Sequence, residues 1–386
     1  MSQPSILFLQ ATNPAIYPPL INAGWLLAEA GFRPVYLSSP HAQNHLTMPP
    51  IPGMIVDEMP VRPSYVMAKG AYLAYIARAI SLARKLRPSA VYASDPLGAL
   101  PGILAAKACG AVLIYHEHDS PSCEHDLNLV VRRARAAAGK AARLVVFPNE
   151  VRAERCGPTI HLSPDRVAIV WNVPRRAEIP SIRHSQGAPF ILYYHGSINP
   201  ERLPMAVAEA VNRFGGRVVM RIAGYTTGSG ETHMREMIEK YGPAAQGGVI
   251  DYVGQVPSRD RLLEQASAAD AGLALMPMQS ADINMTDMVG ASNKPFDYMA
   301  AGLPVIVSEL LDWRVTFVDP GHGLAANPDS PDTLQAAVSH FLSNPEQKAQ
   351  IGRRNRNKIV DDWNYDTQFR PVVQLLNQIA CGASGT

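Results

Sequence analysis

The sequence predicts an α/β protein made of two doubly wound, parallel-sheet domains in tandem. Short, apolar, β-rich runs alternate with longer amphipathic stretches in two successive series, one before residue 175 and one after residue 188. Near-continuously apolar strands separated by helices are typical of parallel sheets that are covered on both faces. A chain of 386 residues also exceeds the size at which one hydrophobic core usually keeps growing, so two cores are expected.

The individual elements follow from these runs. The first series has its clearest strands at residues 6–11, 34–39, 90–95, 111–116 and 144–149. The second series has them at residues 190–196, 217–224, 249–254, 271–277 and 304–308. The Pro-, Arg- and Ser-rich residues 176–188 lack apolar periodicity and are expected to be a linker. We therefore predict an amino-terminal domain over 1–175, a carboxy-terminal domain over 189–360, and a final helix in 361–386 that returns to the first domain.

Composition excludes several classes of protein. Hydrophobic residues make up 47% and charged residues 18% of the chain, which is ordinary for a folded protein and excludes extended disorder. The first apolar run is only about six residues long and follows no basic leader, so we expect a cytoplasmic protein. The four cysteines show no CxxC or Cys/His spacing, and we expect no metal site and no bound cofactor.

Charge is unevenly distributed along the chain. Residues 1–185 carry 19 Lys and Arg against 12 Asp and Glu, a net of +7, whereas residues 186–386 carry 16 against 21, a net of −5. Two basic stretches, 68–88 and 130–146, look helical. Such helices can lie on an anionic membrane surface, at the inner face of the membrane, or they can present an ordinary solvated face. Both interpretations stay open, and no nucleic-acid partner is expected.

The segment SNKPFDYMAAGLPVIVS, residues 292–308, carries a set of helix signals. Asn293 can cap the amino end, and Pro295 suits the first turn. Gly302 suits the position after the last turn, and Pro304 stops any continuation. We therefore predict a short helix with sharp limits that follows the strand at 271–277.

Two charged residues of this helix have the chemistry of a nucleotide site. The amino end of a helix after a parallel strand stabilises a phosphate, and Lys294 adds a full positive charge there. Asp297, one turn further, can accept hydrogen bonds from the two hydroxyls of a ribose. The alternative is that Asp297 only favours the helix dipole and that Lys294 is a solvated surface residue.

The same segment closely resembles the most recognisable stretch of the family-four (group 1) retaining glycosyltransferases. Their usual form is a Glu followed by Ala-Met-Ala and then Gly-x-Pro-Val, and Asp297 occupies the Glu place here. The resemblance implies the GT-B fold, in which two Rossmann-like domains face a cleft. It also implies that Asp297 grips the ribose of a nucleoside diphosphate sugar, which serves as co-substrate.

Other family landmarks follow in order. The segment HGSINPERLPMAV, residues 195–207, resembles the glycine turn that brings backbone close to the diphosphate, with Gly196 and Arg202 at the family's Gly and Lys places. Ser197 stands where the family has an Arg, so one cation is missing. The loop at Gly254 and Gln255 corresponds to the family's base pocket.

Polar residues follow the strand at 111–116. The family often has a His here, near the transferred sugar, and the resemblance implies that role for His116 or His118. Strand alternation allows only one of them to continue the inward-facing register, and the sequence leaves open which one. The alternative is a loop that caps the next helix. The chain contains no DxD motif, so the leaving charge falls to Lys294, Arg202 and the helix end.

Two departures from the family affect catalysis. Val289 replaces the Glu that contacts the donor sugar, and Asp287 is the nearest carboxylate that can substitute. The loop at residues 12–24 contains prolines where the family has glycines. The sequence predicts metal-independent transfer of a sugar to a hydroxyl acceptor, with retention of configuration. The rivals are a sugar-nucleotide epimerase and a non-catalytic glycosyltransferase-like subunit, and neither the sugar, the base nor the acceptor can be identified.

Overall fold

The computed structural model describes residues 3–41, 46–63, 69–121, 126–182 and 187–383, and it divides into two compact units. Unit 1 comprises Met1–Asn172 and Tyr365–Thr386, and unit 2 comprises Val173–Asn364. Each unit contains one parallel sheet with helices, as predicted. Residues 183–186 of the predicted linker lie outside the described residues. In the described part of the chain, no helix is long and apolar enough to cross a membrane.

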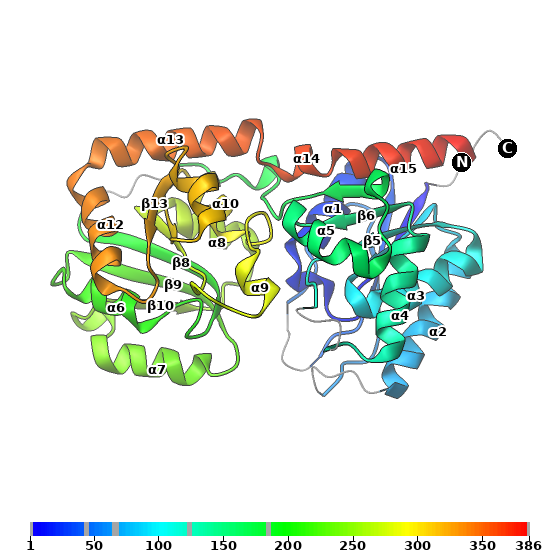
Figure 1. Cartoon of the computed structure of the whole chain (residues 1–386), viewed down its shortest axis with the longest axis horizontal. Coiled ribbons are helices and arrows are strands. Elements are labelled where there is room, and N and C mark those ends of the chain that lie inside the picture. The colour runs from blue at the N-terminus through cyan, green and yellow to red at the C-terminus, as the bar shows by residue number, and fades with distance from the viewer. Residues whose placement is uncertain (1–2, 42–45, 64–68, 122–125, 183–186, 384–386) are drawn as a thin grey trace. The chain divides into compact units, whose positions relative to one another are not determined.

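The sheet of unit 1 has the strand order β3-β2-β1-β4-β5-β6-β7, and neighbouring strands are parallel (Figure 1). Its strands are β1 Ser5–Leu9, β2 Arg33–Ser38, β3 Ile55–Glu58, β4 Ala90–Ser94, β5 Val112–His116, β6 Leu144–Phe147 and β7 Val167–Ile169. The central strands are buried because helices cover both faces of the sheet.

The helices of unit 1 connect these strands. They are α1 Pro18–Glu29, α2 Lys69–Leu86, α3 Asp95–Cys109, α4 Leu129–Ala141, α5 Glu150–Cys156, α14 Tyr365–Gln368 and α15 Arg370–Ala383. Helices α2, α3 and α4 pack side by side as a row. Helix α3 ends at Gly110, whose φ of 73° is a left-handed conformation that favours glycine. The hydroxyl of Tyr365 donates to the carbonyl of Pro19, at 3.0 Å, and so ties the end of the chain to α1.

The sheet of unit 2 has the order β10-β9-β8-β11-β12-β13, again parallel. Its strands are β8 Phe190–Ile198, β9 Val218–Thr226, β10 Ile250–Gly254, β11 Ala271–Ala274, β12 Val305–Ser308 and β13 Gly323–Ala326. Its helices include α6 Met205–Asn212, α7 Gly230–Tyr241, α8 Arg259–Ser267, α9 Ile283–Thr286, α10 Lys294–Ala300, α11 Leu311–Trp313, α12 Pro331–Ser343 and α13 Pro345–Asp361. Figure 1 shows α13 and α7 on opposite sides of this sheet.

In both sheets the strands are all parallel, but the direction in which successive strands are added changes at one point. In unit 1 the reversal lies between β1 and β4, and in unit 2 it lies between β8 and β11. The connections leave these two strands toward opposite sides, so a crevice opens beyond their carboxyl ends. Ligands of open α/β sheets bind at such points, and the residues that follow these four strands are therefore the first place to look for a site.

Three strands are absent from the predicted series, and each has a local reason. Strand β3 lies at a sheet edge with Ile55 and Val56 exposed and two acidic residues beside them, so its apolar signal is weak. Strand β7 has only three residues. Strand β13 reads GLAA and contains no β-branched or aromatic residue, so its propensity for a strand is low.

Candidate functional site

The last residues of β8 lie against α10, and Gly196 lies within this strand, paired with Gly224 of β9, and not in the predicted turn. Gly196 has a φ of 115°, a conformation that L side chains rarely adopt, and an added Cβ would lie 2.9 Å from Cε of Lys294. The guanidinium of Arg202 donates through Nη1 to Oγ of Ser197 at 2.9 Å. The structure thus brings together four of the residues predicted for the donor side, although they come from two segments about 90 residues apart.

Lys294 is buried, with 4% of its surface exposed. Its ammonium lies 5.3 Å from the centroid of the Tyr194 ring, and among the described residues it makes neither a hydrogen bond nor an ion pair. Burial, together with the nearby charge of Arg202, lowers the pKa of Lys294 to about 7. The alternative of a solvated surface lysine is therefore wrong, and a buried cation next to Arg202 is open to an anion.

Asp297 lies at the centre of a buried network. Its carboxylate, 0% exposed, accepts two hydrogen bonds from the guanidinium of Arg259, at 2.6 and 3.1 Å. It accepts a third from Nδ2 of Asn293 at 3.0 Å, and Nε2 of His195 lies 3.3 Å away. The predicted capping role of Asn293 is wrong, because its backbone is helical and its side chain makes no cap bond. The amide instead turns to the carboxylate one turn ahead.

The charged groups of this network contact one another. Burial alone would raise the pKa of Asp297, but the guanidinium of Arg259 and the nearby ring of His195 outweigh it and hold this pKa below its ordinary range. Burial lowers the pKa of His195, so its imidazole is neutral at pH 7. Arg259 also pairs with Glu178 at 3.0 Å. The network therefore holds two carboxylates against one guanidinium.

Gly254 lies level with this network across the sheet. It pairs with Ala223 of β9, and Ala223 pairs with His195 of β8. Its φ of 78° requires glycine, and a shift in register just before it turns the chain away from the sheet. Gln255 follows as an exposed residue. Among the described residues, no hydrogen bond joins Gln255 to the cluster around Lys294.

Asp287 comes two residues after Met285, which contacts Arg202. It ends helix α9, whose Met285 accepts a hydrogen bond through its sulfur from Nε of Arg202 at 3.4 Å. Asp287 is half-buried, as is Val289. Burial and, to a smaller degree, the charge of Asp287 raise the pKa of Asp312. Asp287 therefore follows a contact of Arg202 in the chain, and its charge acts on the carboxyl of Asp312.

The two predicted histidines lie in unit 1, at the end of β5. His116 is 1% exposed, and its Nδ1 lies 2.6 Å from the hydroxyl of Tyr92. His118 is 8% exposed, and neither of its ring nitrogens has a hydrogen-bond partner among the residues that the structure describes. The ring centroids are 3.6 Å apart, so both rings lie on the same side of the chain. The expectation that only one of them continues the inward-facing register was wrong, because residues two positions apart in a strand point to the same side. Burial lowers the pKa of both rings, that of His118 to about 4, so both are neutral at pH 7.

The residue between them has a structural role. Glu117 is fully buried and forms a two-fold ion pair with Arg135, at 2.7 Å for each nitrogen–oxygen pair. Its carboxylate also accepts from the hydroxyl of Tyr115 at 2.9 Å. The alternation of β5 therefore turns Glu117 into the interior. Among the described residues, no group of three His, Cys, Asp or Glu side chains could hold a metal ion.

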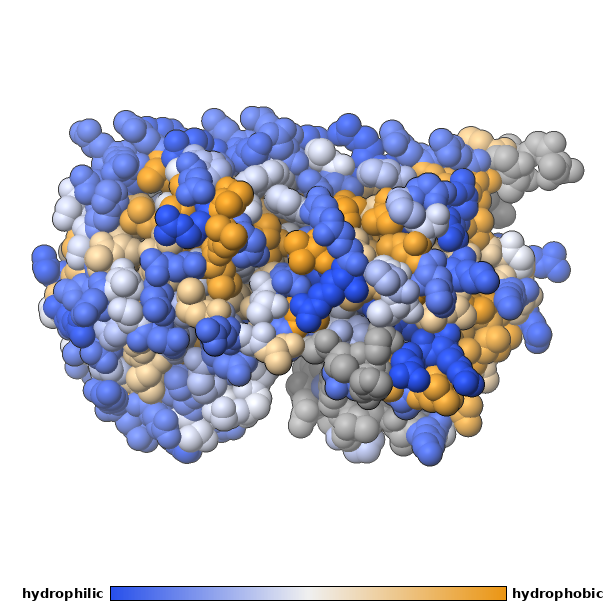
Figure 2. Space-filling model, viewed as in Figure 1, coloured by the Kyte–Doolittle hydropathy of each residue, from blue (hydrophilic) through white to orange (hydrophobic). Residues whose placement is uncertain are grey.

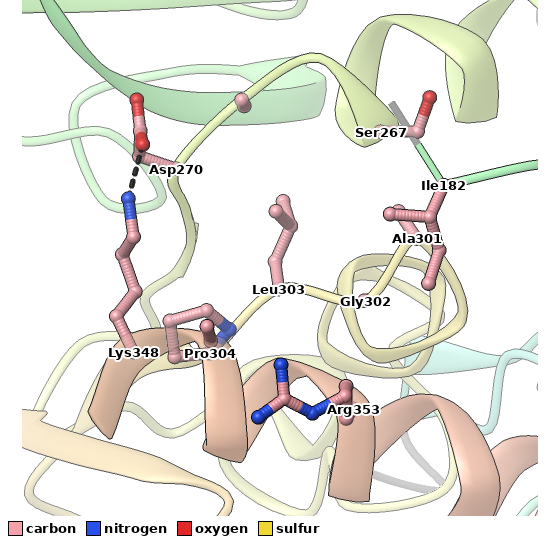
Figure 3. A pocket seen from close by; sticks show the side chains of 11 residues that line it. Ile182, Ser267, Asp270, Ala301, Gly302, Leu303, Pro304, Lys348 and Arg353 are labelled. Atoms are coloured by element: carbon pink, nitrogen blue, oxygen red, sulfur yellow. Dashed lines mark hydrogen bonds and ion pairs between the residues drawn. The ribbon is translucent and has the colours of Figure 1, made fainter. Parts of the chain in front are cut away.

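A small pocket of about 100 Å³ lies elsewhere in unit 2 (Figure 3). Asp270, which directly precedes β11, and Pro304, which directly precedes β12, both line it, so it opens at the amino ends of these strands. Figure 3 shows the ammonium of Lys348 directed at Asp270. None of the predicted site residues lines this pocket, and parallel sheets bind their ligands at the opposite edge.

Comparison with known proteins agrees with this geometry. Residues 175–358 match the family model of the glycosyl transferases, group 1. The fold is that of a GT-B glycosyltransferase. HepE of Anabaena, solved with UDP and glucose, has 13% identity and a TM-score of 0.69 over 97% of this chain and 99% of its own. Sucrose-phosphate synthase of Thermosynechococcus elongatus has 14% identity and a TM-score of 0.69, over 98% and 100%.

A third GT-B relative has a different activity. A UDP-N-acetylglucosamine 2-epimerase has 12% identity and a TM-score of 0.60, with 91% of each chain covered. At such identities the structures share the fold only. No curated protein sequence matches the chain. The group 1 segment ends before α15 and contains every residue predicted for the donor side, whereas the two histidines lie outside it.

Two central residues of the group 1 segment were missed by sequence reasoning. His195 directly precedes Gly196, and a His at the end of an apolar strand was a usable signal. Arg259 lies 38 positions before Asp297, and no spacing rule connects a helix start to a carboxylate so far along the chain. Only the fold brings α8 and α10 together.

Proposed function

We propose that the protein is a glycosyltransferase that takes a sugar from a nucleoside diphosphate sugar bound in unit 2 and transfers it to a hydroxyl acceptor, with retention of configuration. The observation that carries this proposal is the buried ammonium of Lys294, which has no anionic hydrogen-bond partner in the described part of the chain and lies against Gly196 of β8. A diphosphate supplies the missing negative charge. The match of this segment to the group 1 family supports the same ligand.

The diphosphate would be bound by the side chains of Arg202 and Lys294 and by the backbone at Gly196. Arg202 presents a planar guanidinium that can bind two phosphate oxygens at once, and Ser197 already fixes its orientation. Gly196 leaves room for backbone to approach the phosphates. When the bond to the sugar breaks, negative charge develops on the leaving phosphate, and Lys294 and Arg202 stabilise it without a metal ion.

Asp297 would act mainly as a positioning residue, because it orients the side chains that bind to its carboxylate. Its carboxylate is fully buried and already accepts hydrogen bonds from Arg259 and Asn293. We therefore assign it the task of fixing these side chains and His195 beside the donor. Direct contact with the ribose, as the family resemblance implies, would require the carboxylate to exchange one of these partners.

The base would lie against the turn at Gly254 and Gln255. Gly254 is level with His195 across three neighbouring strands. The relatives include HepE solved with UDP and with UDP-glucose, so a uracil base is the first candidate. A thermal-shift series with UDP, GDP and ADP tests the site, because a ligand that binds only the folded state raises the melting temperature.

The test of the donor site needs matched variants. Lys294→Met removes the cation, whereas Lys348→Met removes a lysine that also lies over an aromatic ring, that of Phe190, but at the other edge of the sheet. We expect a shift with one nucleotide that is lost in the first variant and kept in the second. If no nucleotide raises the melting temperature of the wild-type protein, the proposed function is refuted.

Turnover distinguishes the enzyme classes. With the nucleotide sugar alone, a 2-epimerase forms an epimer, whereas a glycosyltransferase at most hydrolyses the donor slowly. NMR of the sugar's anomeric and H2 protons separates these products. Nucleotide binding without any turnover, in the presence of hydroxyl acceptors, would instead indicate a non-catalytic subunit.

We also propose that unit 1 contacts an anionic membrane surface. Leu73 of α2 and Leu129 and Val130 of α4 are 50–66% exposed, and the exposed Arg133 lies one helical turn from Leu129 and Val130. Figure 2 shows hydrophobic and strongly hydrophilic residues side by side where Figure 1 places α2 and α4. Each cation near such a surface contributes about 1 kcal/mol. If the protein does not sediment with anionic liposomes at low salt, this contact is excluded.

A further inference from the structure

Glu178 lies in the segment that precedes β8, within unit 2. It is the last residue of the short 3₁₀ helix Arg176–Glu178, and it is 8% exposed. Its Oε2 accepts from the backbone N–H of Arg175 at 2.8 Å, and its Oε1 accepts from Nε of Arg259 at 3.0 Å. A buried carboxylate that is itself fixed by a backbone N–H thus holds the guanidinium of Arg259 from one side.

Carboxylates on two sides orient Arg259. Its two terminal nitrogens donate to the carboxylate of Asp297 at 2.6 and 3.1 Å, while its Nε is held by Glu178. Burial disfavours its charge, but the two carboxylates outweigh burial and raise the pKa of Arg259 above its ordinary value. A guanidinium has five N–H bonds, of which three are used here. The other two have no acceptor among the residues that the structure describes, and 14% of the side chain is exposed.

The position of Arg259 relates it to the nucleoside part of the proposed donor site. It is the first residue of α8, and the loop before α8 follows Gly254 and contains Gln255, against which the base is proposed to lie. Among the described residues, neither Lys294 nor Arg202 forms a hydrogen bond with Arg259. The proposed diphosphate cations are therefore separate from the pair formed by Glu178 and Arg259.

The segment that carries Glu178 contacts α10 at a second point. Nη1 of Arg356, in α13, donates to the carbonyl of Pro180 at 2.6 Å. It also donates to the carbonyl of Ala300, the last residue of α10, at 2.8 Å. The segment before β8 is thus connected to the first turn of α10 through Arg259 and to its last turn through Arg356. Glu178 therefore has a fixed place from which to hold the guanidinium.

We infer that Glu178 is a positioning residue of the donor site, an inference that rests on the proposed function. It holds Arg259, and through it Asp297, in the arrangement that binds the nucleoside, without touching the ligand. A carboxylate near a bound diphosphate would weaken binding through its charge alone. Positioning has the opposite sign, because loss of Glu178 allows Arg259 to turn away from the nucleoside. The direction of the change in affinity therefore distinguishes the two roles.

Two probes separate the parts of the site. Calorimetric titration of the full chain uses inorganic pyrophosphate, which has no nucleoside, and the nucleoside diphosphate that raises the wild-type melting temperature. In Glu178→Ala the nucleoside diphosphate should bind about tenfold or more weakly, the loss expected for a hydrogen bond to a charged group. Glu178→Gln keeps an acceptor for Arg259 and should lose less. Pyrophosphate should bind to both variants at least as tightly as to the wild-type protein, whereas Lys294→Met should weaken both probes.

A double-mutant cycle tests whether Glu178 acts through Arg259. Arg259→Lys keeps the charge but lacks the planar fork that contacts two carboxylates at once. If Glu178 acts through Arg259, adding Glu178→Ala to Arg259→Lys should cause little further loss of nucleotide affinity. Additive losses would mean that Glu178 acts by another route, and the inference would be wrong.

Asp270→Asn is the matched control for Glu178→Gln. Asp270 is also a buried carboxylate of unit 2, and it accepts from the backbone N–H of Ile191 at 2.9 Å and from the ammonium of Lys348 (Figure 3). It lies at the amino ends of the strands, away from the proposed donor site. Both variants should lose stability in urea, and only Glu178→Gln should lose nucleotide affinity. Equal losses of affinity would show that destabilisation alone explains the effect, against the inference.

The remaining outcomes are separable. If the Glu178 variants bind the nucleoside diphosphate as tightly as the wild-type protein, or more tightly, Glu178 is not a positioning residue, and the wild-type binding still supports the proposed function. If both probes weaken equally in these variants, Glu178 does not act on the nucleoside part, and the inference fails in the same way. If the wild-type protein binds no nucleoside diphosphate, the proposed function fails and the inference fails with it.

Discussion

The two units have sheets of the same order around the reversal point, yet the polar clusters beyond their strands differ in charge. In unit 2 the cluster contains Lys294, Arg202 and Arg259 and a deeply buried carboxylate. In unit 1 the comparable position holds two neutral imidazoles, the amide of Gln10 and the carboxylate of Asp95, but no buried lysine. The backbone provides the same crevice twice, and the side chains decide which ligand can enter it.

The clusters also differ in how their hydrogen bonds are satisfied. Asp297 in unit 2 has three donors, and the unpaired group beside it is a cation. In unit 1 the unpaired atoms are neutral donors and acceptors around Gln10 and His118. Unsatisfied charge favours a charged ligand, whereas unsatisfied neutral groups favour a polyhydroxylated one.

The largest expected effect comes from Asp297→Ala. This change removes one of the two carboxylates that bind the guanidinium of Arg259, so two buried hydrogen bonds are lost, and breaking a buried pair costs about 3–5 kcal/mol. Urea unfolding measures the loss. Asp297→Asn keeps the shape and should lose less. If Asp297→Ala unfolds at the same urea concentration as the wild-type protein, the buried ion pair between Asp297 and Arg259 does not stabilise unit 2.

A smaller effect, confined to binding, is expected for Lys294→Met. Hydrogen bonds to charged groups contribute about 1.5–3 kcal/mol, so the nucleoside diphosphate should bind about 10- to 100-fold more weakly. Calorimetric titration measures the affinity. Because an unpaired buried ammonium disfavours folding, the variant should be no less stable than the wild-type protein. Equal affinities in the two proteins would remove Lys294 from the donor site.

The limits of α10 could be predicted, because its end signals are local. Pro295 lies in the first turn, and Gly302 has the left-handed φ of 78° that a glycine after a helix adopts. The surroundings of the helix could not be predicted. All seven residues from Lys294 to Ala300 are buried, and a helix that is buried on every side has no amphipathic period to reveal which neighbour each residue meets.

The same reasoning applies to the contacts of the two clusters. Gln10 and Asp95 are 85 positions apart, and no pattern relates them until the strand order is known. The pairing of β1 with β4 brings them together. Local sequence thus indicates where strands end and polar residues begin, but it does not indicate which strand ends are adjacent.

Gly196→Ala tests whether nucleotide binding depends on the close approach of Gly196 in β8 to the side chain of Lys294. A left-handed or otherwise strained residue costs about 1–3 kcal/mol, and the new Cβ would also meet Cε of Lys294. Gly216→Ala is the control, because its φ of 81° is also positive but nothing lies within 4 Å of the added carbon. Both variants should lose stability, and only Gly196→Ala should lose nucleotide affinity. Loss of affinity in both would mean that strain alone explains the effect.

The smallest effect is the pH dependence of donor binding. The pKa of Lys294 is about 7 in the free protein, and a bound diphosphate raises it, so binding above pH 7 takes up a proton. Affinity should therefore fall as pH rises above 7, by at most about tenfold per pH unit, and it should level off below 7, where the ammonium is already charged.

Calorimetric titration in buffers of different ionisation enthalpy measures how many protons are taken up when the ligand binds. The ligand should be the nucleotide sugar rather than the nucleotide, since its diphosphate has no group that titrates in this range. Among the titratable groups around Lys294, Asp297 stays ionised above pH 6, because Arg259 holds its pKa below the ordinary range, and burial lowers the pKa of His195. Lys294→Met should bind with no such slope. If the affinity falls with pH equally in both proteins, the proton binds to another group. Lys294 would then not be the titrating cation that distinguishes unit 2 from unit 1.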